Sequence, residues 1–254
     1  MRRCNGRWWG RWWRGGAPGF ACSMLLLAPL AWGEQLPVFQ ISSEPVSEAR
    51  GAQVLSAATG GRVNAKIQTI DRGSVLVQTL GAKQLEIEKA SGGLFLRDTA
   101  RLWNTELRPK LPTQEEARKI ADRFVLENRL LPPNDKYVIA DFAGYSETAI
   151  SPDSGDPHEK TQLDIQVNYS VQLAIEREAG FARVPVVGGG GDFKVAIGEG
   201  GELIGYTGVW RPIAGVAAMA ELIPQREAEE RYRKSLGEMK VTKLDSYLSY
   251  YSPP

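Results

Sequence analysis

Apolar and polar residues alternate along several stretches of the chain, most regularly between residues 161 and 178. The successive odd positions of this stretch are Leu163, Ile165, Val167, Tyr169, Val171, Leu173 and Ile175. Successive side chains of a β-strand point to opposite faces, so the alternation predicts a long strand with one buried face. Other β-type runs lie at 62–70, 74–80, 83–90, 94–103, 136–150, 192–198, 202–213 and 241–254. The turn sequences "DRG", "SGG" and "EGG" separate several of these runs and predict antiparallel neighbours.

Two stretches have the 3.6-residue period of a helix. The first is residues 47–58, which a pair of glycines follows. In the second, Thr113 precedes Glu116 by three residues and completes a capping box. Its apolar face consists of Ala117, Ile120, Ala121, Phe124 and Val125. We expect this helix to lie on a sheet and to end before the prolines that follow it.

The order of the elements predicts an α+β fold. A further helix is expected to start at Pro224 and to end before Gly237. We expect a PepSY-like antiparallel sheet covered by two helices over residues 112–254, preceded by a smaller, mainly-β region at 34–108. The proline-containing sequence "LRPKLP" marks the boundary between the two regions.

Four adjacent glycines lie in "VPVVGGGGDFKVAIGEGGELIG", residues 184–205. A phosphate-binding loop places backbone N–H groups at the start of a helix, and a P-loop also needs lysine followed by serine or threonine. The residues after Gly191 are instead β-type, and no Gly-Lys-Ser/Thr sequence occurs there. Phosphate binding is therefore disfavoured. We interpret the glycines as hairpin turns, where glycine supplies a positive φ.

The first 33 residues have the pattern of an export signal. They contain five arginines, no acidic residue and the apolar run "FACSMLLLAPLAW". Ala31 and Gly33 precede Glu34 at the spacing of a cleavage site. We predict a signal peptide at 1–33, with an uncleaved anchor as the alternative, although a span needs about 20 apolar residues. The protein is thus expected to be exported, to be periplasmic or extracellular, and to meet a membrane only through this segment.

Charge and cysteine content exclude several classes of protein. Without the five arginines of the leader, the chain has more acidic than basic residues and no lysine-arginine cluster. Nucleic-acid phosphates need a basic face, so we expect no nucleic-acid partner. Both cysteines, Cys4 and Cys22, lie in the leader, so the processed chain would have no thiol chemistry and no disulfide.

The single histidine, His158, lies in an acidic stretch with Asp153, Asp156 and Glu159. These side chains would suit calcium, but the EF-hand pattern is absent and a solvated loop is the preferred interpretation. A hydrolase using His158 is a weaker alternative, because the chain has no nucleophile-elbow sequence. We therefore assign no catalytic, cofactor-binding or metal-binding residue, and we expect no cofactor.

Aromatic residues offer one more kind of candidate site. A sugar or peptide groove, or simply core packing, would account for Trp103, Tyr169, Tyr206, Trp210, Tyr247, Tyr250 and Tyr251. The run "SYLSYY", residues 246–251, is expected to be either buried in the sheet or an exposed edge strand.

Three sequences are similar to PepSY-type domains: "PTQEEARKIADRFVLENRLLP", "VPVVGGGGDFKVAIGEGGELIGYTGVWRPI" and "ELIPQREAEERYRK". More narrowly, they resemble the N-terminal part of secreted bacterial proteins that carry an uncharacterised domain called DUF6345. The shared features cover residues 112–236, and none of them is catalytic. The resemblance implies a secreted or membrane-attached module and, in some cases, a propeptide that restrains a protease.

We therefore expect an exported, non-enzymatic PepSY-like module that acts through protein or peptide binding by edge-strand addition. The expected partner is a secreted protease or a cell-envelope component. The alternative function is a pro-region or inhibitor-like accessory of a secreted hydrolase.

Overall fold

The computed structural model describes residues 35–42, 45–61, 65–135, 137–151, 160–177, 180–239 and 241–252. The expected signal peptide lies outside the described residues. The described helices are α1 (Glu48–Ala58), α2 (Gln114–Glu127) and α3 (Gln225–Ser235). The described strands are β1 (Gln35–Ile41), β2 (Gln68–Asp71), β3 (Val75–Leu80), β4 (Lys83–Glu88), β5 (Leu94–Asp98), β6 (Val138–Ser146), β7 (Ala149–Ile150), β8 (Thr161–Gln162), β9 (Ile165–Arg177), β10 (Gly180–Val187), β11 (Asp192–Ile197), β12 (Leu203–Gly208), β13 (Ile213–Glu221) and β14 (Tyr250–Tyr251).

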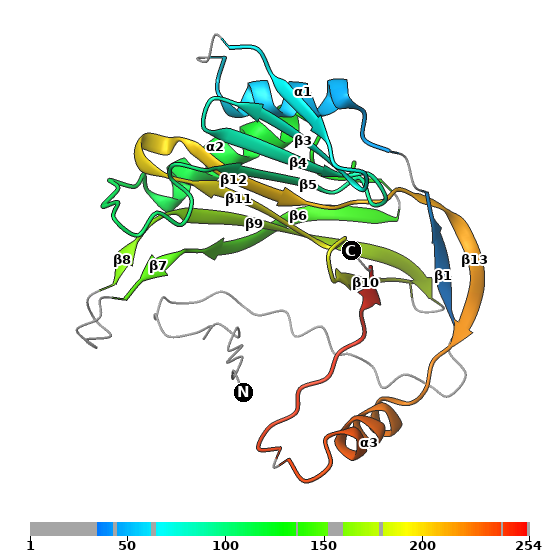
Figure 1. Ribbon diagram of the computed structural model, residues 1–254. Coiled ribbons are helices and arrows are strands. Elements are labelled where there is room, and N and C mark those ends of the chain that lie inside the picture. Colours follow the sequence, from blue (N-terminus) through cyan, green and yellow to red (C-terminus); the bar gives the residue numbers. More distant parts are fainter. Residues whose placement is uncertain are drawn as a thin grey trace.

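Ten of these strands form one sheet in the order β14-β10-β9-β11-β12-β5-β4-β3-β2, with β6 also paired to β9 (Figure 1). The central strand is β9, whose residues 165–170 pair with β11 and whose residues 172–177 pair with β10. The predicted alternation is confirmed, because all seven apolar odd positions from 163 to 175 are buried. A strand with one buried face thus organises the sheet.

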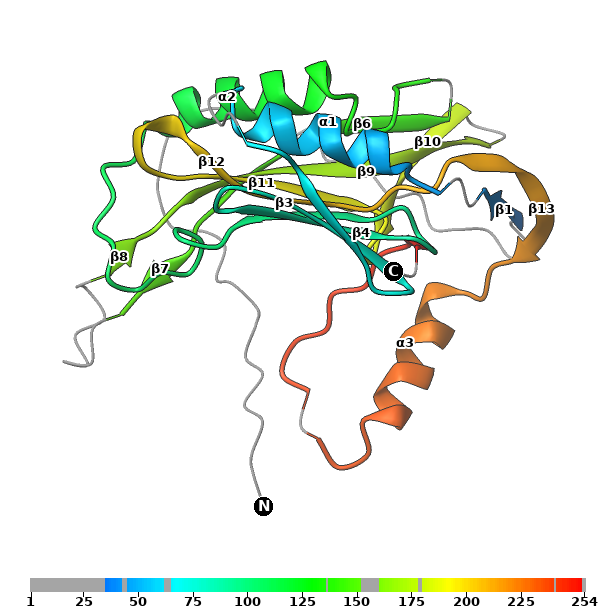
Figure 2. The ribbon, with the colours of Figure 1, turned by 45° about the horizontal axis from the view of Figure 1, so that its top comes forward.

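Helices α1 and α2 lie on the same face of this sheet, as Figure 2 shows. The first packs on β3 and β4, and the second packs on β9 and β11. Val54 and Leu55 of α1 and Phe124 and Val125 of α2 are buried in one core. Burying each such side chain contributes about 1.5–3 kcal/mol. All three predicted helices form, including the capping box at Thr113.

The predicted fold class is wrong. The chain is mostly β, with fourteen strands and three helices among the described residues, and it is not a sheet covered by the two helices expected at 112–254. The second of those helices, α3, has no buried residue and does not cover the sheet. Strands from the expected N-terminal region belong to the large sheet, since β5 pairs with β12. Charged residues dominate α3, so it has little apolar surface with which to pack.

Strands β7 and β8 form a separate two-stranded antiparallel sheet. Two further features extend beyond the helix-covered sheet. One is a two-stranded antiparallel ribbon of β1 and β13. The other is the segment that leaves β13, forms α3 and returns to β14, residues 222–239 and 241–249, which we call the arm. Figures 1 and 2 show α3 projecting away from the sheet and the following segment running back to β14. The remainder, formed by α1, α2 and the large sheet without β14, is called the body.

Candidate functional site

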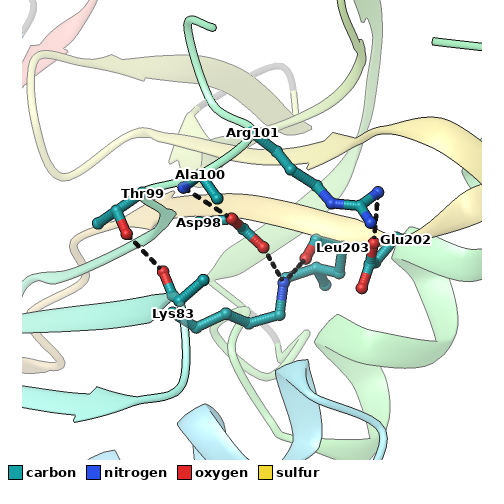
Figure 3. Close-up of polar contacts among 8 residues, drawn as sticks. Lys83, Asp98, Thr99, Ala100, Arg101, Glu202 and Leu203 are labelled. Carbon is teal, nitrogen blue, oxygen red and sulfur yellow. Dashed lines mark hydrogen bonds and ion pairs between the residues drawn. The ribbon is translucent and has the colours of Figure 1, made fainter. Parts of the chain in front are cut away.

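A buried ion pair joins two neighbouring strands of the body. Lys83 begins β4 and Asp98 ends β5, and the antiparallel register places them opposite each other. The Nζ of Lys83 lies 3.0 Å from Asp98 Oδ2 and donates a second hydrogen bond of 2.6 Å to the carbonyl oxygen of Leu203 (Figure 3). Asp98 Oδ1 accepts a hydrogen bond from the backbone N–H of Ala100. The two side chains thereby connect β4, β5 and the start of β12.

A cavity of about 250 Å³ borders this pair. Arg101 and Glu202 at the cavity form a second ion pair, 2.7 Å apart, so the two cations and two carboxylates offset one another. A site for a charged ligand needs an uncompensated charge, and this arrangement provides none. We interpret the Lys83–Asp98 pair as a structural connection between strands. Sequence reasoning did not single out either residue, because a lysine and an aspartate at strand ends are common surface residues.

The four glycines at 188–191 join two strands that pair with successive halves of β9. The hairpin expectation at these glycines is therefore wrong, because β10 and β11 both pair with β9. Gly188 has a φ of 92°, so glycine does bend the chain here as expected. The residues after the glycines form strand β11, as predicted. The expected turn at "EGG" is confirmed, since residues 199–201 connect β11 to its antiparallel neighbour β12.

The last described residues lie against these glycines. Strand β14 pairs in parallel with the end of β10, with Tyr250 opposite Val186 and Tyr251 opposite Val187. The backbone N–H of Ser252 donates a hydrogen bond of 2.9 Å to the carbonyl oxygen of Val187. The run "SYLSYY" thus contributes a short strand at an edge of the sheet, and only its last two residues are in that strand.

Contacts from the ribbon hold the same strand. The hydroxyl of Tyr250 donates a hydrogen bond of 2.9 Å to the carbonyl oxygen of Pro37 in β1. The ring of Tyr250 lies 5.4 Å from the ring of Phe39, centroid to centroid, in a tilted arrangement. Such aromatic pairs contribute about 0.5–1.5 kcal/mol beyond the burial of their area. Residues 250–252 are therefore recognised through both backbone and side chain.

Glycine is required where the strand lies close to the corner. A Cβ on Gly188 would lie 2.9 Å from a ring carbon of Tyr251, and a Cβ on Gly190 would lie 2.7 Å from the Cβ of Ser252. Larger residues at either position would displace residues 250–252. We call the surface formed by residues 186–190, Pro37 and Phe39 the strand site.

Side-chain oxygens already accept from several backbone donors along another edge of the sheet. The backbone N–H groups of Val138, Ala140 and Phe142 in β6 each donate to a side-chain oxygen, at 2.7, 2.6 and 2.7 Å. The acceptors are Asp135, Asn134 and Asp141, respectively. Alternate residues of a strand direct their N–H groups to the same edge, so these three donors are not available to an added strand. The strand site is where the sheet does accept a further strand.

The seven aromatic candidates do not all face one groove. Tyr169 and Tyr206 are buried, and their hydroxyls donate to Asp122 Oδ1 and to the carbonyl oxygen of Leu130. Burial raises the pKa of both phenols. Trp103 is exposed. Core packing therefore accounts for two of the candidates.

Tyr206 also lines a cavity of about 220 Å³ together with Trp210, Phe193, Arg50 and Arg129. The guanidinium of Arg50 donates to the carbonyl oxygens of Asn128 and Arg129 at the end of α2. Cations at a helix C-terminus offset the partial negative charge of the last carbonyls. The geometry thus gives Arg50 a role in joining α1 to α2.

The acidic stretch with His158, Asp153, Asp156 and Glu159 lies outside the described residues. Among the residues that are described, no group of three or more His, Cys, Asp and Glu side chains could hold a metal ion. No described helix is long and apolar enough to span a membrane. Neither the described residues nor the comparisons below provide evidence for an enzymatic activity.

No protein-family model matches the chain, and no curated protein matches it. Among solved structures, an uncharacterised protein from Eubacterium rectale ATCC 33656 aligns with a TM-score of 0.43 and 9% sequence identity. The alignment covers 80% of this chain and 66% of that one, which is just under two thirds of its length. A likeness at this level carries no argument about function. The resemblance to PepSY-type and DUF6345 proteins stays a prediction.

Proposed function

We propose that the protein is an exported, non-enzymatic module that binds an extended polypeptide segment at the strand site. The observation that carries the proposal is the parallel addition of β14 to the edge of β10, over glycines that leave room for it. Strand addition takes affinity from backbone hydrogen bonds and specificity from side-chain contacts. Here the Phe39 ring and the Pro37 carbonyl would select a tyrosine.

Export is proposed on the leader sequence, and the PepSY-like resemblance agrees with it because such modules occur in secreted and membrane-attached proteins. The proposed ligand resembles residues 250–252 of the chain itself, which are two tyrosines followed by a serine. Its sequence is therefore two aromatic residues followed by a small polar residue.

The test uses the full chain with its own strand disabled. Tyr250→Asp removes the ring contact with Phe39 and the hydrogen bond to Pro37, and leaves the glycines intact. A fluorescent peptide of residues 244–252 is titrated into this variant, into the unmodified protein and into the double variant Tyr250→Asp/Gly190→Val. Fluorescence anisotropy measures binding, and circular dichroism confirms that each variant is folded.

We expect saturable binding to Tyr250→Asp, weaker binding to the unmodified protein and none to the double variant. The unmodified protein binds less because its own strand competes at an effective concentration on the order of millimolar. Equal binding to all three proteins, or none to the folded Tyr250→Asp variant, would show that the strand site does not bind peptides.

A further inference from the structure

The arm contacts the body through Leu222 and Leu248, which pack against the core, and its helix adds little to these contacts. Its helix, α3, has 11 residues and none of them is buried. Pro224 at its N-cap provides no side-chain hydrogen bond, whereas Thr113 does so for α2. Isolated helices shorter than about 12–15 residues are only marginally stable in water. The arm therefore depends on contacts other than the packing of its helix.

Most of the polar contacts of α3 lie within the arm itself. Arg226 pairs with Glu230, and Glu227 pairs with Arg231, each one helical turn apart. Ser246, on the returning segment, bonds to Glu229 and Gln225. These bonds join α3 to the returning segment, so the two parts of the arm are held to each other.

Large apolar side chains on and near the arm are exposed. They are Val216, Met219, Ile223, Tyr232, Met239 and Tyr247. Scattered exposed apolar residues are ordinary, but these belong to consecutive elements from β13 to the start of β14. A surface that remains uncovered in one copy of the chain is available for a second.

We propose that the strand site also accepts residues 250–252 of a second copy, so that two copies pair through strand donation. The inference rests on the proposed function, because it uses the same strand site. Its occupant is already known to fit, since β14 occupies the site in the single chain. Strand donation preserves these contacts and brings the exposed apolar residues of two arms together, and such swapping is a low-cost route to a dimer.

Strand donation competes with the chain's own strand, whose effective concentration is on the order of millimolar. Dilute protein is consequently monomeric, and the dimer forms at high protein concentration. It also forms between two variants when one has a working strand but no working strand site and the other has a working strand site but no working strand. This competition makes a complementation experiment decisive.

The experiment mixes two full-length variants. Tyr250→Asp impairs the donor strand, and Gly190→Val impairs the acceptor site, so neither variant has a working pair within one chain. Phe39→Ala is a second acceptor variant, which removes the ring contact without altering the glycine corner. Native mass spectrometry and light scattering after size-exclusion chromatography measure the mass of each variant alone and of the mixture of Tyr250→Asp with Gly190→Val. The control is Gly190→Val mixed with the double variant Tyr250→Asp/Gly190→Val.

We expect each variant alone to remain a monomer and the mixture to show a doubled mass with one copy of each. The free peptide of residues 244–252 should reverse the pairing, and the double variant should not pair with Gly190→Val. If the mixture stays monomeric while the peptide binds Tyr250→Asp, the second copy is the wrong occupant and the strand site stands. If neither pairing nor peptide binding occurs in folded variants, the strand donation and the proposed function both fail.

Discussion

Helices α2 and α3 are both rich in charged residues, but only α2 also has an apolar face. Helix α2 begins with a capping box and buries Ala117, Ala121, Phe124 and Val125 on the sheet. Helix α3 has no side-chain cap and buries nothing. The difference shows that charged residues at helical spacing predict a helix, whereas packing on the sheet also requires an apolar face, which α3 lacks. It also distinguishes the body from an arm that is attached through β14, Leu222 and Leu248 and not through its helix.

The largest expected difference in stability is between replacing an aromatic residue of α2 and replacing one of α3. Phe124→Ala in the body should lower the free energy of unfolding by about 3–5 kcal/mol, because it leaves a cavity beside Tyr206. Tyr232→Ala in α3 removes an exposed ring and should change the free energy of unfolding by about 0.5 kcal/mol or less. Urea denaturation followed by circular dichroism measures both. Equal losses would show that α3 is part of the same cooperative unit as α2.

The buried ion pair gives the next largest effect. Lys83→Met leaves the buried carboxylate of Asp98 without its partner and should cost about 3 kcal/mol. The double variant Lys83→Met/Asp98→Leu should recover most of this loss, since both charges are removed together. Lys89→Met breaks the exposed pair with Asp71 and is the matched control, for which little change is expected. A double variant as unstable as the single one would contradict a simple desolvation account.

Substitutions at the N-caps of α2 and α3 should also differ in their effect on stability, but by a smaller amount. Thr113→Ala removes the side-chain oxygen that accepts from the backbone N–H of Glu116, and should cost about 1 kcal/mol. Pro224→Ala removes no side-chain hydrogen bond, so only a few tenths of a kcal/mol are expected. Thermal unfolding of the two variants makes the comparison. A larger loss from Pro224→Ala would mean that the arm is more firmly integrated than its contacts indicate.

The smallest expected effect is a dependence on pH. Burial raises the pKa of Asp164, although the backbone N–H of Thr148 donates to its carboxylate. A carboxyl whose pKa is higher in the folded state stabilises the fold below its unfolded pKa, and this contribution is lost as pH rises through the folded value. Relative to Asp164→Asn, the unmodified protein should therefore lose stability as pH increases above about 4.

For Glu229 in the arm, the expected change of stability with pH has the opposite sign. Hydrogen bonds from Ser246 and Gln225 lower the pKa of Glu229, so its contribution is present above the unfolded pKa and lost as pH falls through the folded value. Denaturation midpoints of Asp164→Asn and Glu229→Gln across an acidic pH series measure both slopes against the unmodified protein. Two slopes of the same sign would contradict the assigned causes.

Local sequence signals predicted the elements whose formation depends on neighbouring residues. The capping box at Thr113 and the alternation along β9 are of this kind, and both are confirmed. The pairing of Lys83 with Leu203 joins residues far apart in the chain, and no local pattern reports it. The same holds for the glycines. Their composition predicted a bend, but the strand that requires Gly188 and Gly190 comes from residues about 60 positions later.

The central claim is that the strand site, together with the packing of Leu222 and Leu248, joins the arm to a stable body. Hydrogen–deuterium exchange of the unmodified protein and Gly190→Val tests it most directly. We predict that amides of α3 and of residues 241–252 exchange through local opening, and that Gly190→Val accelerates residues 250–252 while β9 stays protected. An arm as protected as β9, or residues 250–252 unaffected by Gly190→Val, would contradict the claim.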